Sequence, residues 1–404
     1  MNKSLAEISK YFIIPVLLPS VFTGFFPNKI VAVQALCYYL ILYILWLKRK
    51  QWHKEEFDGG IIFKLVFFYS GLTYLRGFFN IDWYPDWINQ FSGLVFLCFL
   101  MPMLLFVSST LNLCKIYQGI IKFGIPLCVI NALLPSSDGQ MNFQHNMYFL
   151  LGFIFCIPYI KKKYRIFILL GLLVIVLYDI DRRSIFLNAG IAFFIFLFYQ
   201  FIKSVALRKL LFYLFVLSPI ILLFLGLFCD FNIFSNIGEE DSVELTEGGR
   251  AANVDSRTSI YLDVMLEIDK KKAYLFGLGG NGKTETSLSD NAYVDYGEIY
   301  KYGRPGTESG MLNNIQYGGI FGLLVYSLLF IVAAKRGVFN SNNEYMRMLG
   351  MFIAFKFLYS FIEDRLGAQA SSFYLFLWIG MCYNKYFRCM TDFEIKQYFN
   401  QVFK

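Results

Sequence analysis

Residues 177–190 read LYDIDRRSIFLNAG, a short charged interval between two long apolar runs. Apolar runs of about 15 to 24 residues suit helices that cross roughly 30 Å of hydrocarbon, and a charged interval marks the membrane surface between two crossings. The same alternation continues along the chain, whose 404 residues are 57% hydrophobic and only 16% charged. A soluble domain usually has about 25% charged residues. The sequence therefore predicts an all-α polytopic membrane protein.

The apolar runs predict the number of crossings. We expect twelve transmembrane helices, at 11–26, 30–47, 61–79, 91–107, 117–134, 147–160, 165–179, 184–202, 210–229, 311–334, 347–363 and 370–386. The first run follows Lys3 and Lys10 as a secretory signal would, but it is long and has no small-residue cleavage site. We expect it to remain as a helix.

The distribution of Lys and Arg predicts the orientation. With the N-terminus inside, the inner segments carry 21 Lys and Arg residues and the short outer loops carry 4, which are Lys29, Arg182, Arg183 and Arg365. Cytoplasmic loops accumulate positive charge, so both termini are predicted to be cytoplasmic. The net charge of +8 reflects this bias, and we infer no nucleic-acid partner from it. With two histidines and no closely spaced cysteine pair, the sequence predicts no metal site.

One segment, 230–310, is too polar for the membrane. It holds 15 of the 29 acidic residues, faces outward, and is too long for a structureless loop. The predicted organisation is therefore helices one to nine in 1–229, a large outer loop in 230–310, helices ten to twelve in 311–386, and a cytoplasmic tail in 387–404.

Within the outer loop, the sequence predicts an amphipathic helix over 255–272. Ile260, Val264 and Ile268 recur at helical spacing, and Asp255 or Ser256 can cap the N-terminus. Arg257 then lies in the first turn, where free backbone N–H groups already favour an anion.

The next motif, GLGGNGKT at 277–284, matches the pattern of a nucleotide-binding phosphate loop. No apolar helix follows Thr284, no strand ending in an acidic residue is evident as a partner, and the segment faces outward, where nucleotide is scarce. The sequence therefore favours a flexible glycine turn that lines a site, and no nucleotide partner.

Two basic residues within apolar runs require explanation, because a charge at mid-bilayer costs about 3 kcal/mol on insertion scales. Lys356 lies nine residues beyond Arg347 and so roughly 13 Å deep. It could contact a buried headgroup or an acid, or make a structural ion pair or an interior polar contact. Arg76 lies near the outer end of the third helix and could be an interfacial anchor beside Trp83 and Trp87, or a substrate-binding residue.

The charged interval of 177–190 has two interpretations. Arg182 and Arg183 could form a local salt-bridge cluster with Asp179 and Asp181. They could instead clamp a phosphate group at the membrane surface, which guanidinium groups suit better than ammonium groups. In the second case we expect Arg183 to be the principal residue.

The outer loop ends in RPGTESGMLNNIQYGGIFGLLVY, residues 304–326, which leads into the tenth helix. Glu308 precedes this helix and could cap it, or act as a general base that takes a proton from a sugar hydroxyl. Arg250 and Arg304 are further cationic residues of the loop that could bind the same substrate.

Three patches, DRRSIFLNAG at 181–190, DSRTSIYLDVM with the following LFGLGGNG at 255–282, and RPGTESGMLNNIQYGGIFGLLVY, resemble the O-antigen polymerase and O-antigen ligase superfamily of bacterial envelope-polysaccharide enzymes. The resemblance covers about 145 residues. It implies a GT-C-type glycosyltransferase in the bacterial inner membrane, with a large periplasmic loop. Such an enzyme transfers a glycan from polyprenyl diphosphate to an acceptor with inversion, without a metal or other cofactor.

Carried over to this chain, the resemblance assigns Arg183 or Arg182, together with Arg257, to the diphosphate. Glu308 stands where the ligase branch typically has a histidine, which favours a polymerase that extends a lipid-linked repeat unit. The implied partners are the polyprenyl-diphosphate-linked oligosaccharide, the membrane and a chain-length regulator.

Two alternatives remain open at this stage. An O-antigen ligase would share the site and transfer the glycan to lipid A-core. A flippase or exporter of lipid-linked oligosaccharides would also suit twelve crossings, but the chain shows no repeat across its midpoint, as many transporters do.

Overall fold

In the computed structural model of the chain, residues 4–18, 30–52, 56–108, 111–133, 151–178, 183–228, 256–285, 303–304, 306–307, 309–363 and 370–401 are described. Most of these residues are helical, and isolated β-bridges join Phe57 with Asn384 and Thr284 with Arg304. The predicted all-α class is confirmed.

Most helices follow the apolar runs of the sequence. The run 147–160 is an exception, because its described part, 151–160, holds a four-residue helix, a turn and a short 3-10 helix, Ile157–Tyr159. The longer ones are α3 (Ile30–Leu47), α4 (Gly60–Gly77), α12 (Lys162–Tyr178), α13 (Arg183–Phe201), α14 (Val205–Phe228), α16 (Ser256–Lys270), α18 (Gly310–Phe339), α19 (Glu344–Ile362) and α20 (Ala370–Tyr383). The shorter ones include α1 (Leu5–Ile8), α5 (Tyr84–Phe91), α6 (Gly93–Val95), α7 (Met101–Val107), α8 (Leu113–Gly119), α9 (Ile125–Leu133), α11 (Leu151–Ile154), α21 (Lys385–Cys389) and α22 (Asp392–Asn400).

Several of these helices are apolar enough to cross a membrane. Among the described residues, five stretches have the required length and hydropathy, namely Gly60–Asn80, Tyr84–Val107, Val205–Gly226, Gly310–Phe339 and Glu344–Ile362. Shorter apolar helices cover Val33–Leu47, Phe186–Phe201 and Ser371–Tyr383. All eight coincide with runs predicted from the sequence. A helical, multi-pass membrane protein is thus supported, while the count of twelve crossings stays a prediction.

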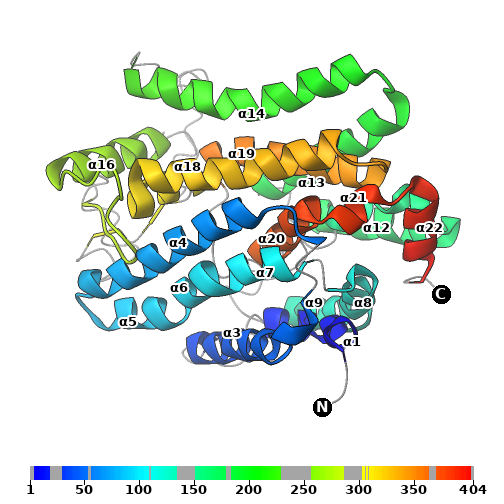
Figure 1. The fold of residues 1–404 in the computed structure, drawn as a ribbon, viewed down its shortest axis with the longest axis horizontal. Coiled ribbons are helices and arrows are strands. Elements are labelled where there is room, and N and C mark those ends of the chain that lie inside the picture. The colour runs from blue at the N-terminus through cyan, green and yellow to red at the C-terminus, as the bar shows by residue number, and fades with distance from the viewer. Residues whose placement is uncertain are drawn as a thin grey trace, which may run out of the picture.

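Helix α19 is the centre of the bundle. It is buried over 83% of its apolar stretch, whereas α14 is buried over 22% of its own and lies at the edge (Figure 1). Helix α18 pairs with α19 closely because Gly337 faces Gly350, and a Cβ on Gly350 would lie 2.7 Å from the Val338 nitrogen. Small residues at such contacts let membrane helices approach each other.

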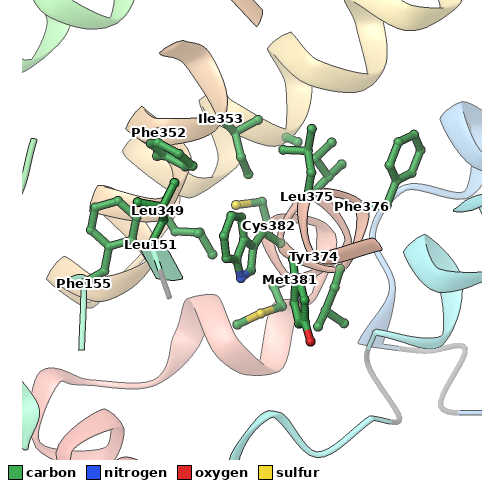
Figure 2. Close-up of a cluster of buried hydrophobic side chains, with 14 of the residues drawn as sticks. Leu151, Phe155, Leu349, Phe352, Ile353, Tyr374, Leu375, Phe376, Met381 and Cys382 are labelled. Atoms are coloured by element: carbon green, nitrogen blue, oxygen red, sulfur yellow. The ribbon is translucent and has the colours of Figure 1, made fainter. Parts of the chain in front are cut away.

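A second set of contacts joins α19 to α20 and α11. Figure 2 shows Leu151 and Phe155 on one side of this cluster, Phe352 and Ile353 of α19 above it, and Cys382 of α20 among them. All of these side chains are at most 5% exposed. This close-packed apolar region joins α19, α20 and the segment around α11 in the middle of the bundle.

The bundle has two distinguishable ends, which we call the α16 end and the α22 end (Figure 1). At the α16 end, the Tyr261 hydroxyl of α16 donates to the Phe361 carbonyl oxygen of α19 at 2.7 Å. At the α22 end, Asp392 of α22 accepts a hydrogen bond from the backbone nitrogen of Glu344, where α19 begins, at 3.0 Å. Helix α19 therefore runs from the α22 end to the α16 end.

Both chain ends lie at the α22 end. Asn112 contacts Ser9 through its carbonyl oxygen at 3.5 Å and Tyr398 through its side chain at 3.3 Å. Helix α22 buries Ile395 and Phe399 completely. The described segments next to both termini therefore lie near each other, and the cytoplasmic placement of the termini stays a prediction. The predicted tail is a packed helix over much of its length.

Helix α18 is interrupted within its apolar stretch. Gly319 has φ +58° and ψ −149°, which is not helical. The backbone groups around this break pair with residues 274–279 of the outer loop. These hydrogen bonds run from Leu278 N to Gln316 O (2.6 Å), from Gly279 N to Tyr317 O (2.9 Å), from Ile320 N to Tyr274 O (2.9 Å) and from Phe321 N to Leu275 O (3.1 Å). Because lipid offers no hydrogen-bond partners, such a break requires a protein segment to satisfy it.

We expect Gly319→Ala to destabilise the protein. The backbone conformation is one that essentially only glycine adopts, which costs about 1–3 kcal/mol, and the new Cβ would lie 2.6 Å from the Gly277 nitrogen. The melting temperature of the detergent-solubilised protein should therefore fall clearly. Gly190→Ala in α13 is the control, because nothing lies within 4 Å of its Cβ position. Equal melting of the two variants would contradict the pairing described above.

Candidate functional site

The start of α13 lies at the α16 end. Near the other end of α13, Arg208 donates to the Tyr199 carbonyl oxygen at 3.4 Å and to Glu344 at 3.1 Å. Nearer its start, Asn188 accepts a hydrogen bond from Lys356 at 3.1 Å. Helix α13 is therefore antiparallel to α19, and its first residue, Arg183, lies where α19 ends.

Helix α16 confirms the predicted amphipathic helix of 255–272. Its apolar face, Ile260, Val264 and Ile268, packs against Leu312 and Ile315 of α18. The 3.6-residue period of the sequence thus correctly identified which face is buried.

The start of α16 is held close to the start of α18. The Tyr261 hydroxyl lies 3.1 Å from the hydroxyl of Ser309, which caps α18 by accepting from the Leu312 nitrogen. The backbone nitrogen of Gly310 donates to the Glu363 carbonyl oxygen at 3.1 Å. The beginning of α18, the end of α19 and the first half of α16 therefore meet.

The structure thus brings three helix starts to one end of the bundle. Arg183 opens α13, Arg257 lies in the first turn of α16, and Ser309 follows Glu308 in the chain. The helix dipole favours negative charge at each of these positions, while at α18 the nitrogens of Gly310 and Leu312 already donate to protein oxygens. Arg182, Arg250 and Glu308 lie outside the described residues, and Arg183 and Arg257 are described through their backbone.

Lys356 is deeply buried, with 2% of its surface exposed. Its Nζ donates to Asn188 Oδ1 at 3.1 Å and lies 5.0 Å from the centre of the Tyr359 ring. Of the alternatives given by the sequence, the interior polar contact is present. This contact couples α13 to α19 just below the three helix starts.

Sequence reasoning missed Glu363. Its carboxylate accepts a hydrogen bond from the Tyr359 hydroxyl at 2.6 Å, at the end of α19. Lys356, Tyr359 and Glu363 are spaced three and four residues apart, so one helical face carries all three. This spacing of polar residues in an otherwise apolar helix is visible in the sequence. It places a polar face on α19 that extends from Lys356 to the α16 end.

Arg76 has a structural role. Its guanidinium donates to the carbonyl oxygens of Phe276 and Gly277, the latter at 2.7 Å. Asn80, one turn later, donates to the carbonyl oxygens of Leu278 and Gly280 at 2.8 and 2.9 Å. These two side chains of the α4 end bind the loop that pairs with α18, rather than serving only as an interfacial anchor.

Arg304 also lies beside this loop. Its backbone forms an isolated bridge with Thr284, with hydrogen bonds of 2.8 and 3.1 Å. The bridge ties the segment before α18 to the end of the glycine motif.

The motif GLGGNGKT is packed into the protein. Its residues 277–282 are buried, and the backbone nitrogens of Leu278, Gly279 and Gly280 donate to protein carbonyl oxygens. Lys283 donates to Asp82 and Asp86 at 2.7 and 2.6 Å. A phosphate-cradling loop presents these nitrogens and its lysine to the ligand, so the geometry differs from that of a nucleotide site. The predicted flexible turn is instead an anchored one.

Charges on the exposed side of the loop form pairs. Lys270 Nζ lies 2.8 Å from Glu285 Oε1, and this hydrogen bond raises the pKa of Lys270 and lowers the pKa of Glu285. Exposed pairs of this kind contribute little to stability. In the part of the chain that the structure describes, no three His, Cys, Asp or Glu side chains gather as metal ligands.

Comparison with protein-family models, with curated proteins and with solved structures found no match. The functional argument therefore depends on the residues and geometry of this chain.

Lys283→Met tests the anchoring of the glycine motif. Removing the lysine leaves the carboxylate of Asp86, which is 4% exposed, without its cationic partner, and breaking a buried pair costs about 3–5 kcal/mol. We expect a large fall in melting temperature for Lys283→Met and a substantial recovery when Asp86→Asn is added. A melting temperature unchanged by Lys283→Met would show that the ion pair does not hold the loop.

Proposed function

We propose that this protein is a polysaccharide polymerase of the bacterial inner membrane. It transfers a growing glycan from polyprenyl diphosphate to the next lipid-linked repeat unit. The observation that supports this most is the gathering of three helix starts at one end of an apolar bundle, each start bearing or directly following a residue of the proposed site. In the proposed topology the α16 end faces the periplasm.

The diphosphate would be held at this end. Arg183 and Arg257 belong to two of the helix starts, and Arg182, Arg250 and Arg304 are near them in sequence. Guanidinium groups form paired, charge-assisted hydrogen bonds with phosphate oxygens, and helix N-termini add their own N–H groups. Stabilising charge that develops on the leaving group is commonly the largest catalytic contribution.

The transfer itself requires one proton acceptor. The Glu308 carboxylate takes the proton of the acceptor hydroxyl, the hydroxyl oxygen forms a bond to the anomeric carbon, and the bond from that carbon to the diphosphate oxygen breaks. The electron pair leaves with the diphosphate, where the arginines neutralise it. Attack opposite to the leaving group inverts the anomeric carbon.

Lys356 adds a positive charge below this site. It lies six residues before the end of α19, which is about 9 Å along the helix axis. A membrane protein retains a buried ammonium group at a cost, usually for function. We assign Lys356 to the electrostatic stabilisation of the diphosphate. Arg76 is more distant and positions the loop.

Deleting the gene and separating the cell-surface glycan on a gel tests the activity. A single repeat unit on its anchor is expected for a polymerase. Assembled polymer that is not attached to its anchor would indicate a ligase instead, and repeat units retained on the inner leaflet would indicate a flippase. Either of these two results would contradict the proposal.

Glu308→Gln and Arg257→Ala should each abolish polymer formation in the deletion strain while the protein stays in the membrane. The first removes the proton acceptor, and the second removes a charge from the diphosphate site. Arg49→Ala is the matched control, since Arg49 is exposed at the end of α3 and packs only on Trp46. Full-length polymer from both site variants would refute the assignment.

Lys356→Met separates an electrostatic role from a structural one. Methionine has a similar length without the charge, but it leaves the buried Asn188 side chain without its hydrogen-bond partner, which costs about 1–3 kcal/mol. Adding Asn188→Leu replaces both partners by apolar groups, which can be nearly neutral. We expect the double variant to melt close to the wild type and still to lose at least tenfold in polymer. A wild-type amount of polymer would remove Lys356 from the site.

A further inference from the structure

A pocket of about 90 Å³ lies between α4, the α6–α7 segment, α18 and α20. It begins at the first turns of α18, with Asn313 and Asn314, and extends past the break, with lining residues on both sides of Gly319. Its volume is several times what one water molecule needs. Most of its lining surface is apolar.

Two departures from regular helix border this pocket. The first is the break at Gly319, and the second is a π-helical turn, Phe96–Leu100, between α6 and α7. Turns of the π type are frequent at functional sites. Small side chains, Ser70 and Cys98, line the pocket beside these departures.

The lining changes character along the membrane normal. Towards the α16 end it contains Thr73, Asn313 and Asn314, whereas towards the α22 end it contains Val66 and Leu329, with Tyr326 as the one polar-tipped side chain among the deeper lining residues of α18. Thr73 and Val66 are seven residues apart on α4, which is about 10 Å. The pocket is therefore polar at one end and apolar at the other.

The polar residues at that end are already hydrogen-bonded within the protein. Asn313 donates to the Thr307 carbonyl oxygen at 2.8 Å and accepts from the Thr307 nitrogen at 2.7 Å. Asn314 donates to the Gly310 carbonyl oxygen at 2.8 Å and accepts from the Tyr69 hydroxyl at 3.1 Å. Ordered water needs two to four polar partners, so the deeper, apolar part suits hydrocarbon better than water.

The pocket also has an opening. Tyr69, Leu97 and Tyr317 are half-buried, while most other lining residues are buried. These three residues come from α4, the π-helical turn and the first half of α18. A chain could therefore enter from the surrounding bilayer.

We propose that this pocket holds a segment of one hydrocarbon chain from a membrane amphiphile, whose polar headgroup remains at the α16 end. The polarity of the lining sets the orientation, and the volume admits a few carbons of a single chain. If the proposed polymerase function holds, the isoprenoid chain of the lipid carrier is the expected source. The acyl chain of a phospholipid has the same chemistry, and the experiment below distinguishes the two.

The test uses the full-length protein in membranes and a photoactivatable polyprenyl phosphate that carries a diazirine on its chain. Cross-links should map to residues 66–73 and 94–102. Excess unlabelled polyprenyl phosphate should reduce them at least tenfold, and excess phosphatidylglycerol should reduce them less. If only phosphatidylglycerol reduces the cross-links, the pocket still binds a hydrocarbon chain, and that chain belongs to a phospholipid. Cross-links found only on exposed faces such as that of α14 would overturn the proposal.

Ser70→Phe and Gly71→Phe form a matched pair. Phenylalanine at position 70 fills the pocket, whereas nothing lies within 4 Å of the Cβ position of Gly71. We expect cross-linking to fall at least tenfold in Ser70→Phe and to persist in Gly71→Phe. Equal cross-linking in two variants that melt alike would overturn the proposal. These experiments measure binding of the chain and not glycan transfer. A loss of the pocket proposal therefore does not decide the polymerase proposal, which the analysis of the cell-surface glycan tests separately.

Discussion

The pairing between the broken helix α18 and residues 274–279 is the constraint on which the rest of the described structure depends. A helix that lies in a bilayer cannot leave backbone groups without partners, so the break at Gly319 exists only with the loop in place. Arg76 and Asn80 then bind the other side of the same loop, which ties α4 to α18. Helix α16 leads directly into this loop and therefore has to lie along the first turns of α18.

A second constraint comes from the buried polar contact of Lys356 with Asn188. The contact joins α19 and α13 at a depth where water does not compete, and such contacts specify which helices pair. Together with the Arg208 contacts at the other end of α13, it determines the direction of that helix. The starts of α13, α16 and α18 are thereby brought to one end, although more than 120 residues separate the first from the last.

The features that suit a ligand are the pocket beside the irregular helix segments and the helix starts at the α16 end. A pocket that is polar towards the α16 end lies beside the break in α18 and the π turn before α7, and the starts of α13, α16 and α18 lie at that same end. The glycine motif, in contrast, uses its nitrogens and its lysine for anchoring. A motif that matches a ligand-binding pattern can thus serve the fold, because its backbone donors bind whatever acceptor the structure offers.

The sequence by itself determined most of the long helices, since hydropathy and charge specify which segments enter a bilayer, and the period of Ile260, Val264 and Ile268 specified the buried face of α16. Its assignment of an anionic substrate to the helix starts stays a prediction. Only the tertiary structure decided that α18 is broken, because IQYGGIFGLL reads as one continuous apolar run and the partners of the break lie about 40 residues earlier. The partners of Arg76 and Lys356 were hidden for the same reason: they are a backbone carbonyl and an amide, which no local pattern marks, and packing alone brings them within reach.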